Sequence, residues 1–293
     1  MRPGPLPLAY TKRGVCAVQP AHRHVSLPHN RTDIAMRVIS FCADGLREAV
    51  GKGFFEWALR QDPDIICVQD LRLSEARLGA SRYNPEGYFS YFWDAIDGTS
   101  NGVAIYTRKL PKAIMTGLGL GEADGEGRYI QADFENISIA CLLAPAARLD
   151  DPGSLARKSR FFEQLQSQLD KVRKKRRQYI LCGNWNMAHT ARDVHRATAH
   201  QDEPGFLAAE RLWLDTLFGT LGYVDAFRAV NADDDEFSWW PAGRDGGQAW
   251  RVDFQVISGG LRGTIEYGAL YKGQEFSSHA PLTMDYDIEL ERL

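Results

Sequence analysis

Four short polar segments follow apolar runs of the chain and carry the side chains best suited to chemistry. They are ISFCADGLR (39–47), VQD (68–70), GNWN (183–186) and SSHAP (277–281). Polar groups on loops held at the ends of strands are where active sites usually lie. Each segment alone is also a common turn composition, so the prediction of a site depends on all four together.

Alternating strands and helices must position these segments. The predicted strands, rich in β-branched and aromatic residues, are 37–41, 64–70, 88–94, 102–108, 128–134, 137–145, 178–184, 237–240, 251–258 and 281–290. Helices are expected near 46–60, 154–177 and 207–221. In the second of these ranges apolar residues recur at helical spacing. Helices interspersed among many strands favour sheets covered by helices.

The order and spacing of the four polar segments resemble those of the endonuclease/exonuclease/phosphatase superfamily, and within it the exonuclease III branch. Active relatives read SFNxNGLR, QET, GDxN and SDH where this chain reads SFCADGLR, QDL, GNWN and SSH. The resemblance covers about residues 36–290. It implies an α/β fold of the exonuclease III/DNase I type, a four-layer α/β sandwich of two facing mixed sheets with outer helices.

The resemblance also assigns a role to each position of the site. Such enzymes use a magnesium ion, held mainly by carboxylates, and a base that orients the attacking water. The metal carboxylates correspond to Asp70 and Ser278, and the water-activating aspartate corresponds to Asn184. The remaining family positions, two amides, a phosphate-contacting tyrosine and a histidine oriented by an aspartate, correspond to Cys42, Asn186, Leu143, His279 and Asp253.

This chain departs from that pattern in ways that predict a degenerate catalytic site. Asn186, Asp253 and His279 keep the family residue, and Asp70 is a shortened glutamate. Cys42, Leu143, Asn184 and Ser278 are changed in kind. An amide cannot act as a base near neutral pH, and losing a general base typically costs about 10²–10⁴ in rate. We therefore expect no cofactor and no magnesium binding at millimolar concentration, and an ordinary enzyme is not the favoured reading.

A second resemblance concerns stretches outside the site. The segments 127–145, 173–183, 204–215, 217–228, 237–241 and 250–258 are similar to the catabolite repression control family. That family keeps the exonuclease III fold without the nuclease site. The resemblance implies a bacterial post-transcriptional regulator that acts with the RNA chaperone Hfq on A-rich mRNA.

Two alternatives stay open. Active exonuclease III relatives share some of the same segments, so the first is a magnesium-dependent DNA 3′-exonuclease or abasic-site endonuclease that acts on duplex DNA in repair. The second is a phosphatase or another phosphodiesterase that uses Asp70, Asp44 and Asn186.

Several residues are candidates for nucleic-acid contacts. The run from 171 to 177 holds six basic residues, Lys171, Arg173, Lys174, Lys175, Arg176 and Arg177. It could contact phosphates or, equally, complement the dipole at the end of a helix. Arg128 could meet phosphate or form a surface ion pair, and Trp239 could stack on a base or pack in the core. Asp44 could add a carboxylate to the site or serve only as a turn residue before a glycine.

Composition and charge limit the classes of protein to which the chain can belong. The chain has 293 residues and a formal net charge of −3, so a nucleic-acid surface must be local. It contains no apolar run of about 18 residues that would span a membrane, and its five cysteines show no CxxC spacing. We expect a cytoplasmic protein with no membrane partner. Residues 1–35 are expected to be a disordered extension or sequence upstream of the true start, and residues 36–293 to form one domain.

Overall fold

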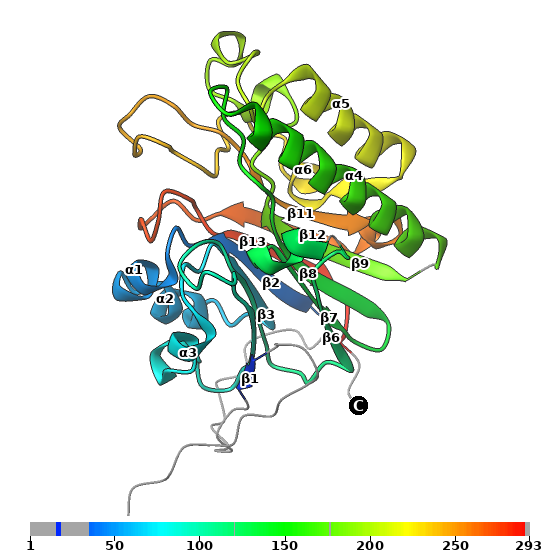
Figure 1. Cartoon of the computed structure of the whole chain (residues 1–293). Helices are drawn as coiled ribbons and strands as arrows, with labels where there is room; N and C mark the ends of the chain where they lie inside the picture. The colour runs from blue at the N-terminus through cyan, green and yellow to red at the C-terminus, as the bar shows by residue number, and fades with distance from the viewer. Residues whose placement is uncertain (1–15, 19–34, 120, 176, 291–293) are drawn as a thin grey trace, which may run out of the picture.

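Two β-sheets face each other in the computed structural model, with helices on both outer faces (Figure 1). The structure describes residues 16–18, 35–119, 121–175 and 177–290. This architecture confirms the predicted four-layer α/β sandwich, because both sheets are mixed and each carries an outer layer of helices.

The first sheet contains seven strands in the order β1-β4-β5-β3-β2-β13-β12. They are β1 (Cys16–Val18), β4 (Phe89–Trp93), β5 (Val103–Thr107), β3 (Ile65–Gln69), β2 (Ala35–Cys42), β13 (Leu282–Asp287) and β12 (Ile265–Leu270). Only β2 and β3 pair in parallel.

The second sheet contains six strands in the order β10-β11-β9-β8-β7-β6. They are β10 (Tyr223–Asp225), β11 (Asp253–Ser258), β9 (Gln178–Asn184), β8 (Ile137–Leu143), β7 (Tyr129–Asp133) and β6 (Ala113–Thr116). Here β8 and β9 form the parallel pair. The expected strand at 237–240 is wrong: only isolated bridges from Trp239 to Trp250 and His279 form there.

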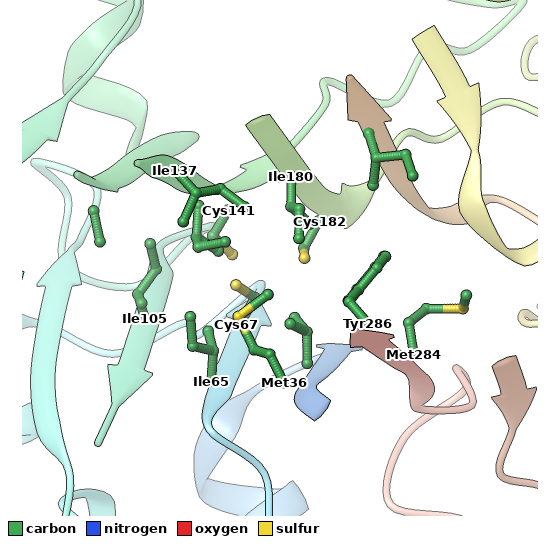
Figure 2. Packing of buried hydrophobic residues seen from close by; sticks show 14 of the residues in the cluster. Met36, Ile65, Cys67, Ile105, Ile137, Cys141, Ile180, Cys182, Met284 and Tyr286 are labelled. Carbon is green, nitrogen blue, oxygen red and sulfur yellow. The ribbon is translucent and has the colours of Figure 1, made fainter. Parts of the chain in front are cut away.

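A continuous apolar layer fills the space between the two sheets. Figure 2 shows Met36, Ile65 and Ile105 of the first sheet facing Ile137 and Ile180 of the second. Burial of this area is the main favourable term in folding. The thiols of Cys67, Cys141 and Cys182 lie in the same layer and are free.

The outer helices pack on the opposite faces of the sheets. The first sheet is covered by α1 (Leu46–Gly51), α2 (Phe54–Arg60) and α3 (Glu75–Leu78). The second is covered by α4 (Pro152–Lys174) and α5 (Ala208–Asp215), with the short α6 (Ala226–Val230) after β10. The helix expected over 46–60 is two helices, because Gly53 adopts a left-handed φ of 86° between them.

The segment before residue 35 departs in part from its expectation. Residues 1–15 and 19–34 of the expected disordered extension lie outside the described residues. Cys16–Val18, however, pair antiparallel with β4 and extend the first sheet by one strand. None of the helices in the described part of the chain is long and apolar enough to cross a membrane.

Candidate active site

The parallel strand pairs bring the predicted site residues to one edge of the two sheets. In the first sheet, Cys42 at the end of β2 stands opposite Gln69 of β3. The loops that follow these strands stay together, because the amide of Gly45 donates to the carbonyl of Asp70 at 2.9 Å. Carboxylate-bearing loops from two strands therefore meet at this edge.

The second sheet supplies the opposite wall. Asn184 at the end of β9 stands opposite Leu143 on β8 and Asp253 on β11. Between the walls lies an open cavity of about 440 Å³, here called the strand-end cavity. Its lining residues are Cys42, Asp44, Asp70, Arg72, Thr99, Ser100, Asn101, Arg128, Leu143, Ala144, Ala146, Asn184, Asn186, Trp239 and His279.

A buried histidine–aspartate pair forms the floor of the cavity. His279 Nδ1 lies 2.7 Å from Asp253 Oδ2, and Ser238 Oγ donates to the same oxygen at 2.7 Å. Burial alone would lower the pKa of His279, but the Asp253 carboxylate outweighs it and raises that pKa well above 6.5. The structure brings His279 and Asp253 together, as the resemblance implies, and leaves Nε2 as the ring nitrogen on the side of Cys42 and the cavity.

Two of the changed positions touch each other. Asn184 Nδ2 donates to Cys42 Sγ at 3.5 Å, and both side chains are almost fully buried. Burial raises the pKa of Cys42 to about 11, although the neighbouring His279 acts in the opposite direction. Asn184 Oδ1 also accepts the amide of Asn186 at 2.8 Å, and Asn186 Nδ2 donates to the carbonyl of Ala144 at 2.7 Å. These bonds hold Asn186 just after the end of β9, where it lines the cavity.

A second group of polar side chains centres on Asp44. Its Oδ2 accepts the amide of Ser278 at 3.2 Å and also the Ser278 hydroxyl. The Arg72 guanidinium bonds Asp70 and lies 3.4 Å from Asp44 Oδ1. Ser278 does not line the strand-end cavity itself, so Asp44 presents the carboxylate at this corner.

The backbone around the cavity is unusually strained. Among the described residues, eight non-glycine residues have positive φ, and five of them line the cavity: Asp44, Asp70, Arg72, Asn101 and Asn186. Such conformations cost of order 1–3 kcal/mol each and cluster at functional sites, where surrounding bonds hold them. The strain therefore marks this edge of the sheets independently of its side chains.

Arg128 and Trp239, both predicted to contact nucleic acid, lie on the cavity wall. Arg128 Nε is bonded to Glu126 at 2.5 Å, and its guanidinium also reaches the carbonyl of Leu143 at 3.4 Å. Trp239 stacks on His279, with ring centroids 5.9 Å apart and an interplanar angle of 22°. It is half-buried and keeps part of its surface toward the opening.

The basic run lies elsewhere. It ends α4 and leads into the start of β9, whereas Asn184 and the cavity lie at the other end of that seven-residue strand. At about 3.3 Å per residue the two ends are roughly 20 Å apart. Lys174 and Arg173 pair with Asp170, and Arg177 bonds Ser138 Oγ at 2.5 Å. Arg176 is outside the described residues.

Several residues of the site were not found from the sequence, and three of them make contacts that matter to the argument. Arg72 follows Asp70 by two positions, Asn101 lies in the loop before β5, and Ser238 supports Asp253 from outside the cavity. A basic residue close behind a strand-end carboxylate was the available signal for Arg72. Ser238 gave no signal, because its role depends on a contact across fifteen positions.

The donor atoms around the cavity do not fit magnesium. Magnesium takes oxygen ligands in near-ideal octahedral geometry. Of the two lining carboxylates, Asp70 is bonded to the permanently charged Arg72 guanidinium, and Asp44 makes only a longer contact with it at 3.4 Å. The other oxygen donors of the lining are neutral amides and hydroxyls, and the donors grouped most closely with Asp44 are the sulfur of Cys42 and a nitrogen of His279. The prediction that magnesium does not bind at millimolar concentration therefore has a structural reason and stays a prediction.

Comparisons with known proteins point to nucleases. Residues 43–268 match the family model described as "Endonuclease/Exonuclease/phosphatase family". The chain is 31% identical over 261 residues to an exodeoxyribonuclease of Bacillus subtilis, which covers 86% of this chain and 100% of the relative. It is 27% identical over 259 residues to a DNA-(apurinic or apyrimidinic site) endonuclease of Dictyostelium discoideum, covering 86% and 71% of the two chains.

Solved structures agree on the fold. An AP endonuclease from Archaeoglobus fulgidus superposes with a TM-score of 0.79 at 22% identity, covering 86% of this chain and all of that one. A 3′-5′ exonuclease from Neisseria meningitidis gives a TM-score of 0.77 at 21% identity, with the same coverage. These matches confirm the fold. The finer resemblance to the catabolite repression control family stays a prediction.

Proposed function

Because the chain belongs to the Endonuclease/Exonuclease/phosphatase family, we propose that it acts on DNA, with a phosphoester received by the strand-end cavity. The observation that carries this proposal is the pair of His279 and Asp253, joined at 2.7 Å on the cavity floor beside Asn186. These three positions keep the residues of active relatives. The exodeoxyribonuclease and abasic-site endonuclease among the relatives support DNA as the substrate class.

The chain's own groups suit a phosphate. Arg128 and Arg72 place two guanidinium groups on the cavity wall, and arginine binds phosphate oxygens through a fixed fork of donors. When no metal ion is bound, a protonated His279 offers Nε2–H to a phosphoryl oxygen while Asp253 holds Nδ1. Asn184 cannot take a proton from water, so hydrolysis is expected to be slow.

A purified-protein assay tests this function. The full chain is incubated with three duplexes, carrying an abasic site, a recessed 3′ end or a 3′-phosphate, in Mg²⁺, Mn²⁺ or Zn²⁺. We expect duplex binding and slow cleavage of at least one substrate. Arg128→Ala should weaken binding about tenfold or more, because a hydrogen bond to a charged group contributes about 1.5–3 kcal/mol. Arg60→Ala on the exposed face of α2 is the matched control.

A second candidate function is regulation without catalysis. Two observations favour it: the base position is the amide Asn184, and Leu143 is buried in the layer between the sheets where active relatives place a phosphate-contacting tyrosine. In this reading the protein joins Hfq on A-rich mRNA. Gel shifts with and without Hfq separate the two functions. A stable ternary complex, with no duplex binding and no cleavage, would replace the DNA proposal.

A further inference from the structure

Three potential metal ligands of different chemistry meet in the strand-end cavity. One donor atom each from Cys42, Asp44 and His279 lies within 4.8 Å of the other two. They come from the end of β2, the loop after it and the segment before β13. Tetrahedral zinc sites place ligand atoms roughly 3.3–3.8 Å apart, given bond lengths near 2.0–2.3 Å. The cluster therefore needs a contraction of at most about 1.5 Å.

His279 is already oriented as a metal ligand would be. Asp253 Oδ2 lies 2.7 Å from Nδ1, so the other ring nitrogen, Nε2, is left for the cluster. Ser238 Oγ donates to the same carboxylate oxygen and fixes its position. A carboxylate behind a ligating histidine is the usual outer-shell arrangement, and it sets both the tautomer and the ring orientation.

Asp44 is oriented in the same way. Ser278 donates its amide and its hydroxyl to Oδ2, which leaves Oδ1 as the less engaged oxygen. The contact of Arg72 with Oδ1 is long, at 3.4 Å, while the bond of Arg72 to Asp70 is short. Arg72 can therefore keep Asp70 as its partner when Asp44 binds a cation.

From these contacts we propose that Cys42, Asp44 and His279 bind a zinc-like divalent ion at the floor of the strand-end cavity. Thiolate and imidazole are donors that favour zinc and related transition metals, whereas magnesium needs oxygen. Three protein ligands leave the fourth tetrahedral position open. Since all three residues line the cavity, that position faces the space where a nucleic acid would enter.

Asn184 completes the surroundings of the sulfur. Its Nδ2 donates to Cys42 Sγ at 3.5 Å. A hydrogen bond from an amide stabilises a metal-bound thiolate, whereas a carboxylate at position 184 would repel it. Cys42 stands where active relatives carry an amide, and Asn184 where they carry an aspartate. This chain therefore has a sulfur donor beside His279 and one carboxylate fewer. Binding of the metal does not depend on the proposed function, because it needs no nucleic acid.

Cobalt(II) is the probe for this site. Titration of the purified full chain with Co²⁺ alone should give a sulfur-to-cobalt charge-transfer band in the near ultraviolet and visible bands typical of tetrahedral cobalt. Stoichiometric Zn²⁺ should remove both, and a hundred-fold excess of Mg²⁺ should leave them unchanged. Cys42→Ser should abolish the charge-transfer band, and Asp44→Asn should weaken Co²⁺ binding at least about tenfold. Thermal melts of each variant check folding.

The matched control is Cys182→Ala, which removes a buried thiol from the layer between the sheets and not from the cavity. It should keep the cobalt spectrum. Retention of the charge-transfer band in Cys42→Ser would overturn the proposal, as would displacement of Co²⁺ by magnesium. Failure of the DNA assay with an intact cobalt spectrum would overturn the proposed function alone.

Discussion

At the scale of single residues, the changed positions of the site are neighbours in space. Asn184 bonds Cys42, and Ser278 bonds Asp44. Effects of residues that act as one unit are not additive. The loss of activity expected from Asn184 therefore cannot be separated from Cys42, and the loss expected from Ser278 cannot be separated from Asp44. Each residue should be tested together with its partner.

Restoring the base should show whether the cavity still supports hydrolysis. Asn184→Asp places a carboxylate at the end of β9 where active relatives carry the water-activating aspartate. We expect cleavage of the preferred duplex to rise by about 10²–10⁴-fold, the usual contribution of a general base. Initial rates at saturating duplex measure it, with Asn231→Asp after α6 as the control. An unchanged rate with intact binding would show that another group limits the reaction.

At the scale of secondary-structure elements, β9 connects two regions with different roles. Its last residue, Asn184, is in the cavity, while Arg177 lies just before its first residue. The Arg177 guanidinium bonds Ser138 and reaches the carbonyls of Phe134 and Ile137. Arg177 thus connects the start of β9 to the turn before β8, and its guanidinium group stabilises the fold.

Two alanine variants separate this structural role from the rest of the basic run. Arg177→Ala leaves partly buried carbonyls without their donor, so it should lower the free energy of unfolding by about 1–3 kcal/mol. Lys175→Ala removes an exposed side chain at the end of α4 and should stay within about 0.5 kcal/mol of the parent. Urea unfolding at neutral pH measures both. Equal effects of the two changes would contradict the assignment.

At the scale of the whole molecule, a buried ionic cluster joins the loop at Asp193 to the ends of β10 and β11 in the second sheet. Arg251 is 1% exposed and bonds Asp193 and Asp225, each at 2.7 Å. Arg228 of α6 adds a second partner to Asp193 at 3.0 Å. Burial alone would raise the pKa of Asp193, but the two guanidinium groups hold it well below its usual value of 3.8.

The cluster predicts how stability depends on pH. A lowered folded-state pKa contributes stability above the unfolded value near 3.8 and loses it as pH falls through the folded value. Asp193→Asn should therefore cost about 3 kcal/mol at pH 7, because it removes one partner of a buried charge. The difference in the free energy of unfolding between Asp193→Asn and the parent should become smaller below about pH 4. Denaturant unfolding of both proteins at pH 7, 5 and 3 measures this difference.

The control for this series is Asp234→Asn, which removes an exposed partner of Arg192. It should change stability by less than about 1 kcal/mol at every pH, since exposed pairs contribute little. If the difference in the free energy of unfolding between Asp193→Asn and the parent stayed constant from pH 7 to pH 3, the role given to this carboxylate would be wrong.

Strand and helix patterns in the sequence predicted sheets covered by helices, and the resemblance to the exonuclease III branch implied the four-layer arrangement and the positions of the site. Interior strands were found because burial on both faces leaves long apolar runs, as in β9, predicted at its observed bounds. The strands that were missed, β1, β6, β10 and β12, all lie at sheet edges. An edge strand is short or half-exposed, so its composition carries little apolar signal.

Tertiary structure alone decided how the site residues meet. The registers of β2 with β3 and of β8 with β9 place Cys42, Asp44 and Asn184 around one cavity, and no local pattern specifies those contacts. The same registers send the basic run to the far end of β9. Contacts between residues far apart in the chain depend on which backbones pair and on which face each side chain leaves. The metal site proposed for the cavity therefore depends on these long-range contacts and not on a local sequence pattern.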